Sequence, residues 1–252
     1  MNKMSLGVRP ARTMCLAAAV LASVAAPPAV FAGSFSVSPV RIFMQARERA
    51  TAITVVNEGD TELVMQAELF TWKQKADGAD ELAPTEDIVL APPILKMAPR
   101  SRQVVRLANL KPVAGTAQQT YRMLVREIPE ARPAREGVEI QVALAFSLPV
   151  FITPPGAKSK LVCELGKVEG PSVTAVCDNR GEAYAQPVSL TLTTAGGEVL
   201  VSREITGGYV LPQVRRSFDL QRAAGTMPRG PAQLTVTQDD GSKQVFDVRL
   251  GD

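Results

Sequence analysis

The sequence predicts an all-β protein, and three observations support this prediction. Apolar and β-branched residues alternate with polar ones at period two from residue 34 to the end of the chain, as in strands with one buried face. No segment of about 12 residues, the length of an ordinary helix, carries an apolar stripe at the 3.6-residue period. The 252 residues include 19 prolines and 18 glycines, which favours many turns over long helices.

The strands of the first half are expected where alternating or β-branched segments lie between turn residues. They are Ser34 to Phe43, Ala52 to Asn57, Leu63 to Trp72, Gln103 to Leu107, Gln119 to Glu127 and Val138 to Ile152. Turns are predicted at residues 57–60 and 76–80, where Gly, Asn and Asp gather. Ala91-Pro92-Pro93 is expected at a sheet edge, because proline cannot donate a ladder hydrogen bond.

A second group of strands follows Thr153-Pro154-Pro155-Gly156, which is typical of a domain junction. We expect one domain at residues 33–154 and another at residues 155–252. The strands of the second are predicted at Lys160 to Leu165, Ser172 to Asp178, Gln186 to Thr193, Glu198 to Glu204, Tyr209 to Leu211, Gln233 to Thr237 and Lys243 to Leu250. Seven short strands within about 95 residues predict a second β-sandwich. Turns are predicted at Ala195-Gly196-Gly197 and at Asp239-Asp240-Gly241, and the second predicts a type I′ hairpin.

Residues 1–32 are expected to be a cleavable secretory signal peptide. Basic residues are followed by an apolar run from Met14 to Val24, and Val30-Phe31-Ala32 supplies small residues at the −3 and −1 positions of a cleavage site. The alternative, a membrane anchor, needs about 20 uninterrupted apolar residues. Pro27 and Pro28 interrupt this run, so no membrane insertion is expected after cleavage.

The composition excludes several classes of function. The chain has no histidine, which excludes Ser-His and Cys-His catalysis and removes the commonest metal ligand. The signal peptide holds three of the 28 basic residues and none of the 25 acidic ones, so the mature chain is formally neutral. A neutral chain has no general attraction for nucleic acid. We therefore expect no catalytic residues, cofactor, metal or nucleic-acid partner.

Two cysteines remain after the signal peptide, Cys163 and Cys177. Export into an oxidising compartment makes a disulfide the default interpretation. The alternative is a metal site, but two thiolates without histidine or a second cysteine pair cannot complete a zinc shell unless carboxylates take part.

The segment from Val138 to Val150 is unusually long and one-sided. One face carries Val138, Ile140, Val142, Leu144, Phe146, Leu148 and Val150. At about 3.3 Å per residue the segment spans about 40 Å, twice an ordinary strand. Two interpretations are open: a core strand buried throughout by its own sandwich, or a strand that partly serves another chain. The second follows because an overlong apolar edge is an aggregation hazard unless a partner pairs with it.

Several segments, taken in order, resemble the periplasmic pilus-assembly chaperones of the PapD-like family. The first half supplies Ser38-Pro39-Val40-Arg41, Val56-Asn57, residues 99–107 (Pro-Arg-Ser-Arg-Gln-Val-Val-Arg-Leu) and Arg126-Glu127-Ile128-Pro129. The second half supplies Gly208-Tyr209-Val210-Leu211-Pro212 and Asp239-Asp240-Gly241. Leu148-Pro149-Val150-Phe151 resembles the archaic or alternative branch of the family.

The resemblance implies two immunoglobulin-like sandwiches in an L-shaped arrangement and no enzymatic activity. It implies a periplasmic chaperone that folds and stabilises pilus subunits by donor-strand complementation and delivers them to an outer-membrane usher. The donor strand falls on Val138 to Val150. Because its last residues adjoin the domain junction, we expect Phe146, Leu148 and Val150 to form a buried base. Val138, Ile140, Val142 and Leu144 are then expected to enter the hydrophobic groove of the subunit.

The resemblance also assigns a carboxylate anchor. Arg41 matches the Arg that binds the subunit's C-terminal carboxylate, whereas the family's anchoring Lys is replaced by Pro149. Arg106 and Arg126 match further basic positions, for which structural ion pairs are an equal alternative. The positions of an interdomain ionic network hold Gln118, Thr153 and Asp239, of which only the last is charged.

Two other functions remain as alternatives. A structural pilus or adhesin subunit would carry its donor segment as an N-terminal extension, whereas here the long alternating segment closes the first domain. A carboxylate-only glycosidase would need a pair of acids such as Asp80, Glu81 or Glu86, which are expected in surface loops.

Overall fold

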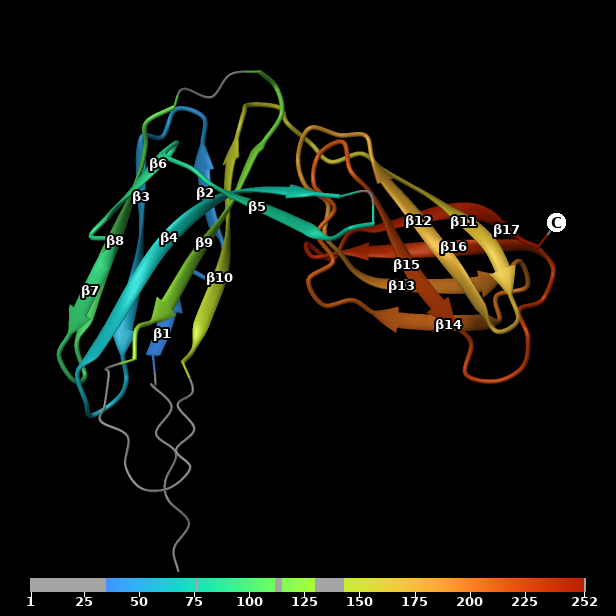
Figure 1. Ribbon diagram of the computed structural model, residues 1–252. Coiled ribbons are helices and arrows are strands. Elements are labelled where there is room, and N and C mark those ends of the chain that lie inside the picture. Colours follow the sequence, from blue (N-terminus) through green and yellow to red (C-terminus); the bar gives the residue numbers. More distant parts are fainter. Residues whose placement is uncertain (1–34, 76, 112–114, 130–142, 252) are drawn as a thin grey trace, which may run out of the picture. The chain divides into compact units, whose positions relative to one another are not determined.

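The computed structural model describes residues 35–75, 77–111, 115–129 and 143–251, and residues 32–252 form one compact unit. The described residues form strands and turns, which confirms the all-β class (Figure 1). None of them forms a helix long and apolar enough to cross a membrane.

Two sheets formed by strands β1 to β10 make the first sandwich. One sheet has the order β1-β3-β8-β6, with β1 at Phe35–Ser38, β3 at Ala50–Asn57, β8 at Arg102–Asn109 and β6 at Ile88–Ala91. The other has the order β2-β10-β9-β4-β5, with β2 at Ile42–Gln45, β10 at Ala145–Thr153, β9 at Gln119–Glu127, β4 at Leu63–Gln74 and β5 at Asp80–Pro84. Strand β7, at Ile94–Met97, also pairs with β4.

The period-two pattern of the sequence places the core of the first sandwich. In β4, Leu63, Met65, Ala67 and Leu69 are buried, while the residues between them are partly exposed. Such alternation is expected where one face of a sheet packs against a second sheet and the other meets solvent. The same alternation in the neighbouring strands completes a core that consists mostly of aliphatic side chains and methionines and includes Phe35 and Tyr121.

Strands β11 to β17 make the second sandwich. One sheet has the order β11-β12-β15, with β11 at Leu161–Glu169, β12 at Ser172–Asn179 and β15 at Arg215–Gln221. The other has the order β14-β13-β16-β17, with β14 at Val199–Glu204, β13 at Pro187–Thr194, β16 at Gly230–Gln238 and β17 at Lys243–Leu250. Cys163 and Cys177 lie directly opposite each other on β11 and β12 and form the predicted disulfide.

Several strand predictions were wrong in their boundaries. The single strand expected at Ser34 to Phe43 is two strands, β1 and β2, which belong to different sheets and are separated at Pro39. The strand expected at Tyr209 to Leu211 is only an isolated bridge between Ala185 and Val210. The expected strands omitted β5, β6, β7 and β15.

The turn between β16 and β17 differs from the predicted type I′ hairpin. The amide of Gln238 donates to the oxygen of Ser242 (2.9 Å), so three residues form the loop. Within it Gly241 has a positive φ of 82°, whereas Asp239 and Asp240 do not. A type I′ turn needs positive φ at both central residues, whereas a three-residue loop needs it only at the last. Asp239 is the first residue of this loop.

Candidate functional site

Strand β10 has an open main-chain edge over part of its length. It pairs with β9 in antiparallel fashion from Ala145 to Ile152, but with β2 in parallel fashion only from Val150 to Thr153. On the side occupied by β2, the described residues therefore provide no strand partner for residues 145–149. An open edge of this kind is where an additional strand can pair.

The hydrogen-bond pattern shows which residues face this edge. The oxygen of Leu144 accepts from the amide of Glu127 on β9 (3.0 Å), and the oxygen of Thr153 accepts from the amide of Ala46 after β2 (3.2 Å). Because main-chain groups alternate in direction along a strand, even-numbered residues face β9 and odd-numbered residues face the side of β2. Ala145, Ser147 and Pro149 consequently face the open edge. The missing amide hydrogen of Pro149 thus leaves the β9 ladder intact.

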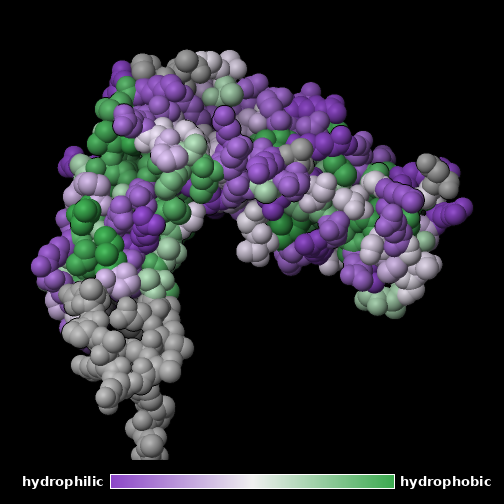
Figure 2. Space-filling view, viewed as in Figure 1, coloured by the Kyte–Doolittle hydropathy of each residue, from purple (hydrophilic) through white to green (hydrophobic). Residues whose placement is uncertain are grey.

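The apolar face of β10 becomes more exposed toward its start. Ile152 and Val150 are fully buried and Leu148 is 2% exposed, whereas Leu144 is 37% exposed. Phe146 lies between these extremes, and its ring packs edge-on against Phe35 of β1, with centroids 5.0 Å apart. Figure 2 shows hydrophobic residues at the surface around the end of the first sandwich where β10 begins. The sandwich therefore stops covering the apolar face near Phe146.

The predicted donor segment is described only in part. Leu144, Phe146, Leu148 and Val150 are described. In the described part of the strand expected at Val138 to Ile152, β10 runs from Ala145 to Thr153. The predicted groove residues Val138, Ile140 and Val142 lie outside the described residues.

Arg41 lies immediately before β2, at the end of the open edge. The first residue pair between β10 and β2 is Val150 with Ile42, so Arg41 and Pro149 directly precede it on their strands. The Arg41 side chain is 38% exposed, and its guanidinium donates through Nη1 to Asp239 Oδ2 and to Gln186 Oε1 (3.1 Å). The hydrogen bond to Asp239 raises the pKa of Arg41 above its ordinary value. The anchor predicted from the sequence is thus accessible, but it already holds a carboxylate.

Aromatic rings line the surroundings of Arg41. Phe43 of β2 is 52% exposed and stacks on Phe151, with centroids 5.7 Å apart. Phe151 in turn stacks on Tyr184 at 4.2 Å. Burial raises the pKa of Tyr184 to about 12, so its hydroxyl is neutral at ordinary pH. An incoming carboxylate would therefore meet one cation beside a mostly apolar wall.

A cation–π contact extends this aromatic group. The Arg122 guanidinium lies 3.7 Å from the ring centroid of Trp72, and Tyr209 packs edge-on against the same indole ring. Arg122 also lies 3.6 Å from Asp80, while burial lowers its pKa below the ordinary value. Trp72, Phe151, Tyr209 and Leu211 form a buried cluster shared by segments of both sandwiches. No local sequence signal predicted this cluster, because its members come from distant segments.

The positions of the expected ionic network form neutral hydrogen bonds. Gln118 Nε2 donates to the Thr153 hydroxyl (2.8 Å), and Gln118 Oε1 accepts from the amide of Tyr184 (3.0 Å). Asp239, the one charged member, pairs with Arg41 instead. The sequence identified the loss of the charges but not this new partner.

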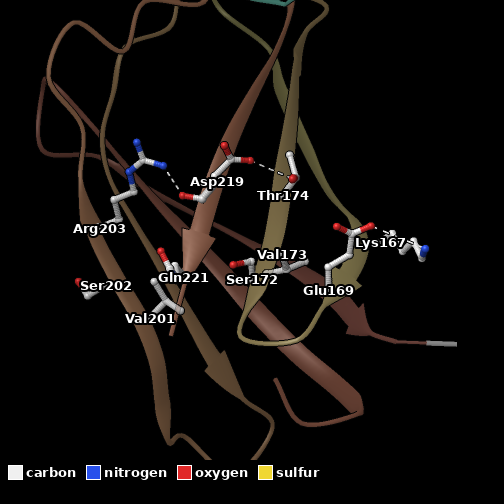
Figure 3. Close-up of a pocket in the computed structure, with 10 residues that line it drawn as sticks. All are labelled: Lys167, Glu169, Ser172, Val173, Thr174, Val201, Ser202, Arg203, Asp219 and Gln221. Carbon is white, nitrogen blue, oxygen red and sulfur yellow. Dashed lines mark hydrogen bonds and ion pairs between the residues drawn. The ribbon is translucent and has the colours of Figure 1, made fainter. Parts of the chain in front are cut away.

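Other candidate residues have structural partners or lie elsewhere. Arg126, which matched a basic family position, forms an ion pair with Glu68 (2.7 Å). Arg106 is exposed on β8, in the sheet opposite β10. A groove of about 770 Å³ in the second sandwich is lined by residues of β11, β12, β14 and β15 (Figure 3). Several of its polar groups already bond one another, as in the hydrogen bond from Thr174 to Asp219 (3.0 Å). Among the described residues, no acidic and cysteine cluster could hold a metal ion.

The comparison with protein families agrees with this arrangement. Residues 34–158 match the model of the pili and flagellar-assembly chaperones, PapD N-terminal domain. The chain belongs to the PapD-like pilus-assembly chaperones. It is a chaperone of the chaperone-usher pathway and not an enzyme, which decides against the glycosidase and pilus-subunit alternatives. The family is periplasmic; the predicted signal peptide lies outside the described residues.

Relatives of this chaperone are similar along most of its length. The probable fimbrial chaperone LpfB of Escherichia coli O157:H7 is 23% identical over 84% of this chain and 81% of its own. The chaperone protein LpfB of Salmonella typhimurium is 26% identical over 84% of this chain and 87% of its own. The fold is similar to that in the CsuC-CsuE chaperone–tip subunit pre-assembly complex of archaic Csu pili from Acinetobacter baumannii. That match has a TM-score of 0.62 and 19% identity, over 85% of this chain and 98% of the other.

Proposed function

We propose that this chaperone captures a pilus subunit by pairing the open edge of β10, and the segment before it, with the subunit's C-terminal strand. In this proposal Val138, Ile140, Val142 and Leu144 fill the subunit's hydrophobic groove, while Phe146, Leu148 and Val150 hold the base of the donor strand in the chaperone. Arg41 binds the C-terminal carboxylate of the subunit.

The observation that carries the proposal is that the open edge of β10 ends at Arg41. Strand β2 already occupies the continuation of this edge and runs parallel to β10. A subunit strand that follows the same edge in the same direction must therefore end where β2 begins. Its terminal carboxylate then lies beside Arg41, where a charge-assisted hydrogen bond contributes about 1.5 to 3 kcal/mol. A strand of opposite direction would bring no terminal carboxylate to Arg41.

The main-chain groups at this edge determine how many hydrogen bonds the subunit strand can form. Ala145 and Ser147 each offer an amide hydrogen and a carbonyl oxygen, while Pro149 offers only a carbonyl. Pairing thus loses one possible bond next to Arg41, where the family's Lys is also absent. Affinity must depend more on the apolar side chains than it would with two cations, since burial of each aliphatic side chain contributes about 1.5 to 3 kcal/mol.

Two finer assignments belong to the proposal. Leu148-Pro149-Val150-Phe151 supports membership of the archaic or alternative branch, and the fold likeness to the Csu chaperone agrees with it. The CsuC structure is itself a complex with a tip adhesion subunit, which supports subunit capture by this chain. We further infer periplasmic action and delivery of the subunit to an outer-membrane usher.

The test replaces Arg41 and measures subunit capture. Tagged chaperone carrying Arg41→Ala is co-expressed with a subunit from the same gene cluster, and the one-to-one complex is quantified by mass spectrometry. The yield should fall while the melting temperature of the free chaperone changes little, because the Arg41 side chain is partly exposed. Arg249→Ala, which removes an exposed strand arginine from β17, is the matched control. Normal yields with Arg41→Ala would remove Arg41 from the site.

A further inference from the structure

Asp239 occupies the guanidinium to which the proposed function assigns the subunit's carboxylate. We propose that Asp239 is an internal competitor for the carboxylate anchor: it holds Arg41 in the free chaperone, must give way when a subunit binds, and returns when the subunit leaves. This inference rests on the proposed function and adds a residue that sets the strength of capture.

In the free chaperone, Arg41 already uses one side of its guanidinium group. Nη1 of an arginine has two N–H donors, and here one is directed to Asp239 and the other to Gln186. A carboxylate bound by two parallel bonds needs adjacent donors on one side of the guanidinium. The side that includes Nη1 is already used. A carboxylate that instead approached the other side would share one positive charge with Asp239, and two carboxylates so close repel each other.

Main-chain hydrogen bonds hold Asp239 beside Arg41, while its side chain stays partly exposed. The three-residue loop after β16 is held at Gln238, whose amide bonds the oxygen of Ser242. The Asp239 amide donates to the oxygen of Gln186 (3.0 Å), and the Gln186 amide donates to Gln238 Oε1 (3.0 Å). These bonds fix the backbone of Asp239 and of its neighbour Gln186 beside Arg41. The Asp239 side chain remains 23% exposed, so its carboxylate can turn to water without disturbing the loop.

Among the described residues, Asp239 forms no ion pair with a cation other than Arg41. The corresponding network positions, Gln118 and Thr153, are neutral and bond each other. Among the described residues, the ion pair of Asp239 is thus the one with Arg41. Asp239 also supplies the negative charge that offsets Arg41 when the site is empty. The pair can therefore re-form as a subunit departs, which lowers the barrier to release.

The experiment measures how fast the subunit leaves the chaperone. Complexes with a labelled, co-expressed subunit are challenged with excess unlabelled wild-type chaperone, and loss of label from the original chaperone is followed. The variants are Asp239→Asn, Asp240→Asn, Arg41→Ala and the double variant Arg41→Ala/Asp239→Asn. Asp240→Asn is the matched control, since it removes the same charge from the next residue of the same loop. Thermal melting of each free variant confirms that it is folded.

Asp239→Asn should slow subunit loss by about two- to five-fold, the factor that corresponds to one partly exposed ion pair. Asp240→Asn should leave the rate unchanged, and the effect of Asp239→Asn should vanish once Arg41 is absent. An unchanged or faster rate with Asp239→Asn would overturn the inference, and the faster rate would show that Asp239 positions Arg41 for the subunit. If Arg41→Ala leaves the rate unchanged, the anchor in the proposed function is wrong as well. Faster loss with Arg41→Ala but no effect of Asp239→Asn would refute the competitor alone.

Discussion

Substitutions along β10 should separate stability of the chaperone from capture of the subunit. Leu148 is 2% exposed and Leu144 is 37% exposed, although both lie on the same apolar face. An aspartate at position 148 loses the packing of a buried leucine, about 2 to 5 kcal/mol, and also buries a carboxylate, which costs several kcal/mol more. That sum is comparable to the whole free energy of unfolding of an ordinary domain, about 5 to 15 kcal/mol. Leu148→Asp should therefore unfold the first sandwich.

Leu144→Asp should have the opposite profile. The new carboxylate stays hydrated in the free chaperone, so the free energy of unfolding should fall by about 1 kcal/mol or less. In the subunit's groove the same carboxylate would be buried, and capture should be lost. Ile140→Asp and Val142→Asp should behave like Leu144→Asp, whereas Phe146→Asp should resemble Leu148→Asp because its ring packs on Phe35.

Two assays are needed for each variant. Urea unfolding of the free chaperone gives the free energy of unfolding, and co-purification with the subunit gives capture. Leu144→Ala serves as a control that shortens the side chain without adding charge. Equal destabilisation by Leu144→Asp and Leu148→Asp would mean that the chaperone buries the whole apolar face by itself. The donor-strand assignment would then be wrong.

Further predictions concern the disulfide, the tyrosines and the cation–π contact. Replacing Cys163 and Cys177 by alanine should lower the free energy of unfolding by about 2 to 5 kcal/mol without abolishing capture, measured by urea unfolding and co-purification. Burial raises the pKa of Tyr184 to about 12. The contribution of the neutral Tyr184 hydroxyl to the free energy of unfolding is therefore complete below the ordinary tyrosine pKa of about 10 and is lost as the pH rises from 10 toward 12. Tyrosinate absorbance and unfolding should both change within this pH window, and ionisation of Tyr184 at pH 10 would contradict the prediction. Arg122→Met keeps an unbranched side chain but removes the charge over Trp72. Calorimetry should show that the unfolding temperature of this variant is lower by several degrees. An unchanged unfolding temperature would show that the cation–π contact contributes nothing to stability.

Local patterns were sufficient to predict the fold class and much of the strand order. The expected strand at Gln119 to Glu127 coincides with β9, and the two cysteines pair as predicted. The strand prediction depends on the pattern of neighbouring residues, and the disulfide prediction depends on the redox state of the compartment, which the expected signal peptide indicates. Strand β15 was missed although Arg216, Phe218 and Leu220 alternate with more exposed residues, so a signal was present there.

The state of the anchor was decided only by tertiary structure. Arg41 could be selected from its sequence motif, but its partners Gln186 and Asp239 are 145 and 198 residues away in the chain. Whether an apolar face is covered by its own domain likewise depends on where the neighbouring strands end. Here the pairing of β2 with β10 begins only at Val150, so residues 145–149 have no strand partner on that side among the described residues, and Arg41 lies where this open edge ends. Period-two alternation records which face of a strand is apolar, but strand pairing depends on main-chain groups that every residue except proline possesses, so a sequence cannot reveal where pairing stops.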